Sequence, residues 1–288
     1  ATMITKILYY ILVLPISLLP LPILYLFSDI LYLIIYKGIG YRKAVVFTNL
    51  KKSFPEKSEK EIIQIKTDFF KHFFDLIVEI IKMISAGKSF LNKRVTITNA
   101  ELINNYAEKN QTIILVFGHF NNWEWVGQKL SISAKQKVVG IYKPLNNTSF
   151  DSLLKKARTK FGAIAVSMEE SMRYILNTKT ETQIIGIIAD QNPVVNPTTK
   201  WHSFFGREVP VFMGAEKIAK KMNYPVVFCD MQKIGSGEYS ITFEHLVENP
   251  KETLEGEITK RYFERLEKQI SQIPSQWLWS HKRWKHKR

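Results

Sequence analysis

The hydrophobic and polar positions of the chain change their spacing several times along its length. Between Pro55 and Gly87, apolar residues recur at intervals of three and four, with polar residues between them. The apolar positions are Ile62, Ile65, Phe69, Phe73, Ile77, Ile80 and Ile84. This spacing places them on one face of a helix, so the segment is predicted to form a long amphipathic helix.

Beyond this helix the apolar residues gather in short runs of Ile and Val without polar alternation, which is typical of strands covered on both faces. The predicted strands are 94–98, 112–117, 137–142, 163–166, 183–189 and 225–231, with 239–243 as a further candidate. The predicted helices are 100–108, 122–133, 149–160, 169–177, 213–222 and 252–273. The alternation of strands with helices predicts an α/β fold.

The beginning of the chain is far more apolar than the rest. Residues 7 to 28 carry no charge, and the apolar character resumes from 30 to 36. This length suffices to cross a bilayer, but prolines at 15, 20 and 22 interrupt a helix. Because no cleavage site of a signal peptide follows, residues 1–40 are predicted to be a retained membrane anchor, either spanning or monotopic. A pair of apolar core helices is the alternative.

The remaining chain divides at the end of the long helix. Residues 41–92 are predicted to be an amphipathic helical region that packs on the domain formed by residues 93–288, which is predicted to be α/β with a basic tail. The basic residues after the anchor are Lys37, Arg42, Lys43, Lys51 and Lys52, against Lys6 before it. The positive-inside tendency therefore predicts that the body lies on the cytoplasmic face of the membrane.

Composition adds a strong positive charge. The chain has 41 Lys and Arg against 26 Asp and Glu, a formal charge of +15, and its 45% hydrophobic residues argue against disorder. The densest basic cluster is 281–288. We expect it to meet an anionic membrane surface, and no nucleic acid. A frayed, solvated tail is the alternative, which the neighbouring Trp277, Trp279 and Trp284 disfavour.

Several chemistries find no support in the sequence. The single cysteine, Cys229, lies in an apolar run and is not expected to be a nucleophile. The six histidines lack the spacing of a metal site, and no Gly-rich phosphate loop or dinucleotide motif occurs. We therefore expect neither a metal nor a cofactor.

The most informative segment is the end of the predicted strand 112–117, where His119 is followed after four residues by Glu124. The carboxyl ends of strands in α/β sheets open onto the crevice where ligands bind. A turn into the next helix would bring Glu124 within hydrogen-bond reach of His119, which would leave one ring nitrogen free as a general base. Alternatively, Asn121 and Glu124 form a capping box at the helix start.

A histidine and an acidic residue with four residues between them are the signature of glycerolipid-type acyltransferases. Along nearly its whole length, the chain resembles the lipid A biosynthesis (lauroyl/myristoyl-type) acyltransferase family. The matching segments are Tyr41-Arg42-Lys43, Asn49-Leu50, Phe54-Pro55-Glu56, Gly118-His119, Asn122-Trp123-Glu124, Tyr142-Lys143-Pro144, Arg158 ahead of Gly162, Asp190-Gln191, Phe204-Phe205-Gly206, Gly214-Ala215, Gln276-Trp277-Leu278-Trp279 and His281-Lys282-Arg283. Asn121 stands where the family usually has Gly, and Asn tolerates left-handed backbone angles.

The resemblance implies a mixed sheet covered by helices and transfer of an acyl group from acyl carrier protein, or CoA, to a hydroxyl of a lipid A precursor at the inner membrane. His119 would be the base and Glu124 would orient it. Arg158 would bind an anion, and Asp190 would position substrate or pair with Arg158; a solvated arginine and a loop-starting Asp are the alternatives. The resemblance also marks Asn122, Lys143 and Gly206 as substrate-binding candidates. The runners-up are another membrane lipid acceptor (an aminolipid, glycolipid or lysophospholipid) and a non-catalytic lipid-binding protein.

Overall fold

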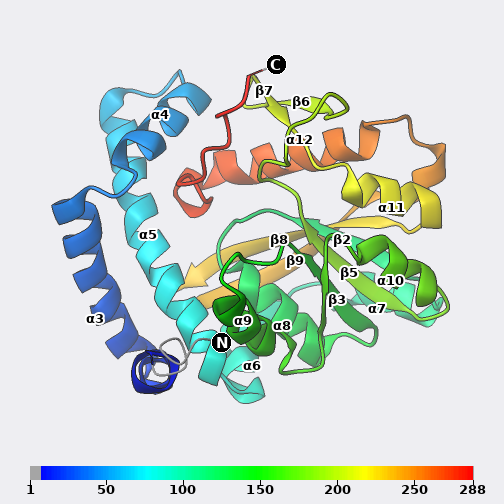
Figure 1. The fold of residues 1–288 in the computed structure, drawn as a ribbon, viewed down its shortest axis with the longest axis horizontal. Helices are drawn as coiled ribbons and strands as arrows, with labels where there is room; N and C mark the ends of the chain where they lie inside the picture. Colours follow the sequence, from blue (N-terminus) through cyan, green and yellow to red (C-terminus); the bar gives the residue numbers. More distant parts are fainter. Residues whose placement is uncertain (1–7, 288) are drawn as a thin grey trace.

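The computed structural model describes residues 8–287 and centres on a seven-stranded sheet (Figure 1). The strands are β1 (Val95–Ile97), β2 (Ile113–Phe117), β3 (Lys137–Tyr142), β4 (Ile164–Ser167), β5 (Gln183–Ile188), β8 (Val226–Gly235) and β9 (Glu238–Val247). Their order across the sheet is β1-β9-β8-β2-β5-β3-β4. Only β8 and β9 pair antiparallel; the other neighbours are parallel. The predicted α/β fold with a mixed sheet is confirmed.

Helices cover both faces of this sheet. They are α5 (Glu59–Ser85), α6 (Lys88–Arg94), α7 (Ala100–Glu108), α8 (Trp123–Ser133), α9 (Thr148–Thr159), α10 (Ser171–Asn177), α11 (Gly214–Met222) and α12 (Glu257–Gln272). Alternate residues of one strand enter different cores: Ile114 and Val116 of β2 belong to one hydrophobic cluster, Ile113 and Leu115 to the other. Because both faces are buried, the strands read as continuous apolar runs.

The long helix α5 begins at a capping box. Ser58 accepts from the backbone N–H of Glu61, and the Glu61 carboxylate accepts from the backbone N–H of Ser58. The helix then contributes Phe70 and Phe74 to one core and Val78 to the other. It therefore links both layers of the α/β body.

The N-terminal helices lie against α5. They are η1 (Tyr9–Val13), α2 (Leu14–Leu18), α3 (Leu21–Leu31), η2 (Tyr32–Ile39) and α4 (Lys43–Ser53). Figure 1 shows α3 beside α5, and the Tyr36 and Phe70 rings stack with centroids 4.2 Å apart. By length and composition, Leu21–Ile39 is one helix apolar enough to cross a membrane. Residues 1–7 of the predicted anchor lie outside the described part of the chain.

A short two-stranded hairpin and the C-terminal segment complete the molecule. The hairpin, β6 (Trp201–Phe204) and β7 (Arg207–Pro210), was absent from the predicted elements. After the short helices η3 (Pro250–Glu252) and η4 (Pro274–Gln276), the chain passes back across the body. Arg283 is completely buried and donates to the Pro210 carbonyl, 2.9 Å away. As far as Trp284, the frayed-tail alternative is therefore wrong, because aromatic and guanidinium groups pack there.

Candidate active site

Two polar side chains follow neighbouring parallel strands at the same level. Strands β2 and β5 pair in parallel, with Phe117 opposite Ile188. His119 comes shortly after Phe117, and Asp190 comes equally soon after Ile188. The carboxyl ends of parallel strands meet at one edge of a sheet, so this register brings the two side chains together.

Asp190 holds His119 through both of its carboxylate oxygens. His119 Nδ1 and Asp190 Oδ1 are 2.5 Å apart, and the His119 backbone N–H donates to Asp190 Oδ2 over 2.8 Å. Burial acts to raise the pKa of Asp190, but the charge and hydrogen bonds of His119 outweigh it and lower the pKa to about 2. An ionised Asp190 favours a proton on Nδ1 and leaves Nε2 as the basic nitrogen.

Glu124 has a different partner from the one expected. It accepts two hydrogen bonds from Arg158, Nε to Oε2 at 2.7 Å and Nη2 to Oε1 at 2.5 Å. The expected His119–Glu124 and Asp190–Arg158 contacts are therefore wrong. The reason is geometric: Glu124 lies in the first turn of α8, which faces the last turn of α9, where Arg158 resides.

The alternative interpretation, a capping box formed by Asn121 and Glu124, is also wrong. The N-cap of α8 is Asn122, whose Oδ1 accepts from the Trp125 backbone N–H at 3.2 Å. Its Nδ2 donates to Glu79 Oε2 at 2.8 Å. Asn122 is completely buried. Its amide therefore fixes the start of α8 and is not among the residues that line the cavity described next.

A cavity of about 710 Å³ opens beside His119. Its polar lining residues include His119, Glu124, Lys143, Arg158, Gln191, Asn192, His281 and Lys285. Its apolar wall includes the buried residues Leu115, Val126, Leu130, Val138 and Ile184. The cavity thus has a polar part, lined by charged and amide side chains, and an aliphatic wall formed by residues of β2, β3, β5 and α8.

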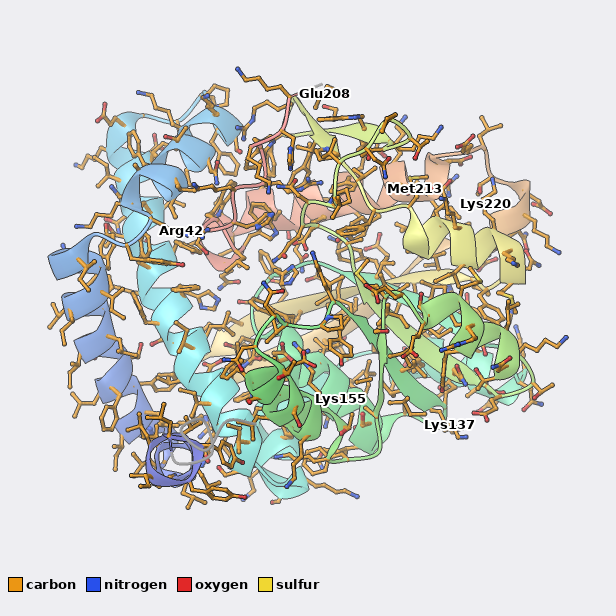
Figure 2. All side chains as sticks on the ribbon, in the orientation of Figure 1. Arg42, Lys137, Lys155, Glu208, Met213 and Lys220 are labelled. Carbon is orange, nitrogen blue, oxygen red and sulfur yellow. The ribbon has the colours of Figure 1, made fainter. Side chains whose placement is uncertain are left out.

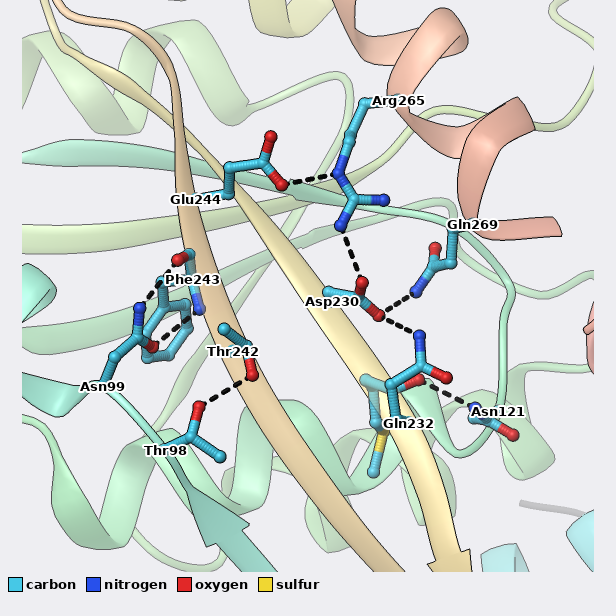
Figure 3. Close-up of polar contacts among 11 residues, drawn as sticks. Thr98, Asn99, Asn121, Asp230, Gln232, Thr242, Phe243, Glu244, Arg265 and Gln269 are labelled. Carbon is cyan, nitrogen blue, oxygen red and sulfur yellow. Dashed lines mark hydrogen bonds and ion pairs between the residues drawn. The ribbon is translucent and has the colours of Figure 1, made fainter. Parts of the chain in front are cut away.

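The turn that carries His119 is tightly packed. A Cβ added to Gly118 would lie 2.6 Å from Leu266 Cδ1, so no side chain fits there without a shift. Asn121 adopts the left-handed conformation with φ of 53°, as its resemblance to a Gly position predicted. Figure 3 shows Asn121 donating from Nδ2 to the Met231 carbonyl of β8, 2.7 Å away.

A polar cluster on β8 lies next to that contact. Asp230 accepts from Arg265, Gln269 and Gln232, at 2.7, 2.6 and 2.5 Å (Figure 3). Arg265 also donates to Glu244 at 2.6 Å. These bonds tie α12 to the β8–β9 hairpin and hold β8 in place behind the His119 turn.

The C-terminal segment also contacts His119 and Asp190. Trp277 Nε1 donates to Asp190 Oδ2 at 2.8 Å, and the Leu278 N–H donates to the His119 carbonyl at 3.0 Å. The Asn121 N–H donates to the Gln276 carbonyl, also at 3.0 Å. In the sequence, Trp277 only disfavours a frayed tail. Its contact with Asp190 joins the segment after η4 to the end of β5, and local sequence patterns do not contain such a long-range contact.

Helix α4 holds this C-terminal segment in turn. Asn49 Nδ2 donates to the Trp279 carbonyl at 3.0 Å, and Arg42 Nη1 to the Ser280 carbonyl at 2.5 Å. Figure 2 shows Arg42 where α4 approaches the C-terminal segment. The predicted region 41–92 therefore contacts the C-terminal segment, which in turn contacts Asp190 through Trp277.

Comparison with known families agrees with this architecture. The family model of bacterial lipid A biosynthesis acyltransferases matches residues 1–286. The chain belongs to this family. A search of the curated proteins finds no match. Membership identifies the chain as an acyltransferase enzyme of lipid A biosynthesis, and it confirms the family predicted from the motifs.

Of the remaining candidate residues of this acyltransferase, some line the cavity and others lie elsewhere. Lys143 lines the cavity, whereas Gly206 lies in the β6–β7 turn and not among the lining residues. Cys229 is buried, and burial raises its thiol pKa, so the expectation of an unreactive thiol is consistent with its surroundings. Within residues 8–287, no group of three or more His, Cys, Asp or Glu residues is arranged to hold a metal ion.

Proposed function

We propose that this acyltransferase moves a fatty acyl group from the thioester of acyl carrier protein, or of CoA, to a hydroxyl of a lipid A precursor. Family membership supports the reaction class. The observation that carries the mechanism is the His119–Asp190 pair at the cavity, with His119 Nδ1 2.5 Å from Asp190 Oδ1. No covalent enzyme intermediate is required.

In this mechanism His119 is the general base. Its Nε2 takes the proton of the acceptor hydroxyl while the oxygen attacks the thioester carbonyl. The carbon–sulfur bond then breaks, and the departing thiolate recovers the proton from the imidazolium. Asp190 orients the ring and stabilises its positive charge, the role that the sequence assigned to Glu124. The low pKa of Asp190, about 2, keeps this carboxylate ionised.

Arg158 and Glu124 serve as a preorganised anion-binding pair. The bidentate contact fixes the guanidinium plane, and both side chains line the same cavity as His119. A guanidinium held in this way can bind a substrate phosphate or stabilise the developing oxyanion. Lys143 and Lys285 add positive charge to the same lining. Glu124 is thus a positioning residue for Arg158.

The aliphatic wall of the cavity suits the acyl chain. Phe117, Ile141 and Ile188 also line the cavity and are partly exposed, so an acyl chain lying against them would cover apolar surface that water otherwise contacts. Each buried methylene contributes about 0.8 kcal/mol, which makes the shape of this wall a determinant of chain length. We place the acyltransferase at the inner membrane with its body on the cytoplasmic face, where basic residues after the apolar helices are expected.

Product analysis by mass spectrometry tests this function. Purified acyltransferase is incubated with acyl carrier protein thioester or acyl-CoA and, separately, with a lipid A precursor, an aminolipid, a glycolipid and a lysophospholipid. We expect one added acyl mass on the lipid A precursor, with the carrier protein as the better donor. Acylation of another lipid alone would overturn the acceptor assignment, and no transfer with any donor would favour a non-catalytic lipid-binding protein.

A further inference from the structure

The apolar helix Leu21–Ile39 turns its hydroxyl-bearing residues towards the body, whereas its charged residues Asp29 and Lys37 are exposed. Tyr25 Oη donates to Glu79 Oε1 at 2.8 Å, and Ser28 Oγ donates to Asp75 Oδ1 at 2.7 Å. Tyr32 and Tyr36 are also buried against α5. The outward face is an apolar stripe of Ile23, Leu26, Phe27, Ile30, Leu33 and Ile34, each at least 40% exposed. This pattern is the reverse of a helix on a water-facing surface, so the stripe fits a hydrocarbon medium.

The packing of this helix is incompatible with a transmembrane position. Its 19 residues span about 28 Å, and α5 runs beside it. A helix crossing the bilayer would carry α5 to the same depth, including Asp68, Lys71 and Asp75. It would also place Asp29 close to the middle of the hydrocarbon layer. Charged side chains at that depth are strongly unfavourable.

The corner before the helix is fastened to the body as well. Lys82 Nζ donates to the carbonyls of Ser17 and Leu19, both at 3.0 Å, and Ser85 Oγ donates to the Ser17 carbonyl. A Cβ added to Gly237 of the β8–β9 turn would lie 2.8 Å from Leu21 Cδ1. Detaching the helix so that it could span would break all of these contacts.

Positive charge lies at both ends of the stripe. Lys37, Lys43 and Lys66 gather at one end, where Lys43 Nζ lies 4.8 Å from the centre of the Tyr36 ring. Lys82 lies at the other end. Lysines that flank an apolar stripe match anionic headgroups around an immersed face. A bilayer therefore explains both the charge and the apolarity of this surface.

We infer that Leu21–Ile39 lies in the plane of one membrane leaflet, with its apolar stripe immersed, and does not cross the bilayer. Leu8, the first described residue, and the α/β body then lie on the same side of the membrane, because the apolar helix Tyr9–Leu18 between Leu8 and Leu21 is too short to cross it. The inference rests on the membrane association of the proposed function but not on its catalytic assignments.

Thiol labelling in sealed membranes tests the topology. One variant carries a Cys-Ser-Gly extension ahead of Ala1, and a second variant carries Lys251→Cys at an exposed position of the body. The native Cys229 is buried and should not react with the reagent. A membrane-impermeant maleimide is applied to intact spheroplasts and to inverted vesicles. We expect both thiols to react only in the same preparation. Reaction of the N-terminal thiol only in the other preparation would establish a spanning helix and overturn the inference.

A charge substitution tests what covers the stripe. Leu26→Glu combined with Ile30→Glu is compared with Leu254→Glu, whose side chain is 78% exposed at a distant site. Binding is measured in 1 M salt to vesicles of phosphatidylethanolamine and phosphatidylglycerol, with thermal unfolding in detergent as the folding check. We expect at least a tenfold weaker binding for the double variant and no change for the control. Unchanged vesicle binding with loss of a dimer would make the stripe a protein interface and overturn the inference.

Discussion

At the scale of single residues, the decisive feature is that the two buried carboxylates near the cavity have different hydrogen-bond partners. Asp190 is held by His119 and Trp277, and Glu124 by Arg158. Asp190 is 1% exposed and Glu124 is 8% exposed, so each buried carboxylate depends on the hydrogen bonds that its partners donate. Asp190 therefore orients the proposed base, His119, and Glu124 orients the proposed anion-binding residue, Arg158.

Removing the base or its carboxylate is predicted to abolish most of the activity. For His119→Ala and Asp190→Asn we expect a fall in the acyl-transfer rate of roughly a hundredfold or more, the range for losing a positioned general base. Asparagine cannot stabilise the imidazolium by charge. The rates are measured by the mass assay, with His202→Ala on β6 as the control. Normal turnover in both site variants would contradict the proposed roles.

Trp277 is predicted to position Asp190. Trp277→Phe removes the donor to Asp190 Oδ2, and we expect kcat to fall about tenfold with KM nearly unchanged, because a hydrogen bond to a charged group is worth about 1.5–3 kcal/mol. Trp284→Phe is the matched control, since Trp284 packs in the same aromatic cluster but donates to the Phe204 carbonyl. An equal loss of kcat in both variants would assign the effect to packing alone.

The candidate site could be predicted from the sequence only in part. His119 and Asp190 both follow apolar runs, which is a local signal, and the rule that ligands bind at the carboxyl ends of strands applies to both. Their pairing depends on β2 lying beside β5, although β3 and β4 come between them in the chain. The contact of Glu124 with Arg158 depends likewise on how α8 meets α9. Local patterns do not contain these long-range arrangements.

At the scale of elements, periodicity located most helices and strands but not their relations. The predicted strand 137–142 coincides with β3, and the predicted helix 100–108 coincides with α7. Strand β8 extends to Gly235, beyond the predicted end at 231, because its partner β9 continues the ladder. The hairpin β6–β7 was missed because its short polar strands, such as Trp201–Phe204, lack an apolar run.

Helix α5 contains an unusual buried histidine that predicts sensitivity to acid. Neither ring nitrogen of His72 has a hydrogen-bond partner among residues 8–287, and burial, with a smaller effect from Lys233, lowers its pKa from 6.5 to about 3. The unfolded chain therefore binds the proton at a higher pH than the folded chain. The contribution of neutral His72 to the free energy of unfolding is therefore fully present above pH 6.5. It decreases as the pH falls below this value, by about 2 kcal/mol at pH 5.

Urea unfolding of the detergent-solubilised acyltransferase at pH 7.5 and pH 5.0 measures this loss. In His72→Leu we expect the loss of unfolding free energy between the two pH values to be smaller by about 2 kcal/mol. His286→Leu, near the C-terminus, should retain the acid sensitivity of the parent. If His72→Leu loses as much stability as the parent, protonation of His72 does not drive the acid effect.

At the scale of the whole molecule, the two ends of the chain converge on the site. The N-terminal helix reaches it through Glu79, which accepts from Tyr25, Tyr239 and Asn122, the N-cap of α8. Burial raises the pKa of Glu79, so these three donors determine whether its charge is tolerated. The C-terminus reaches the site through Trp277. The predicted anchor is therefore also part of the scaffold that holds the site.

Deleting residues 1–40 is accordingly predicted to damage folding as well as membrane binding. The deletion removes Leu21, Leu24, Tyr32 and Tyr36 from the core, and each buried side chain of this size contributes about 1.5–3 kcal/mol. The total approaches the roughly 5–15 kcal/mol by which a whole domain is stable. We expect a lower Tm and at least a tenfold loss of acyl transfer even to a dispersed, short-chain acceptor, because Asn122 loses its support.

The variant with Leu26→Glu and Ile30→Glu separates the two effects, since both side chains point away from the body. It should retain the parent's Tm and its activity on the dispersed acceptor and lose only activity on membrane-embedded lipid. A deletion variant that keeps the parent's Tm and acts normally on the dispersed acceptor would show that residues 1–40 serve membrane binding alone.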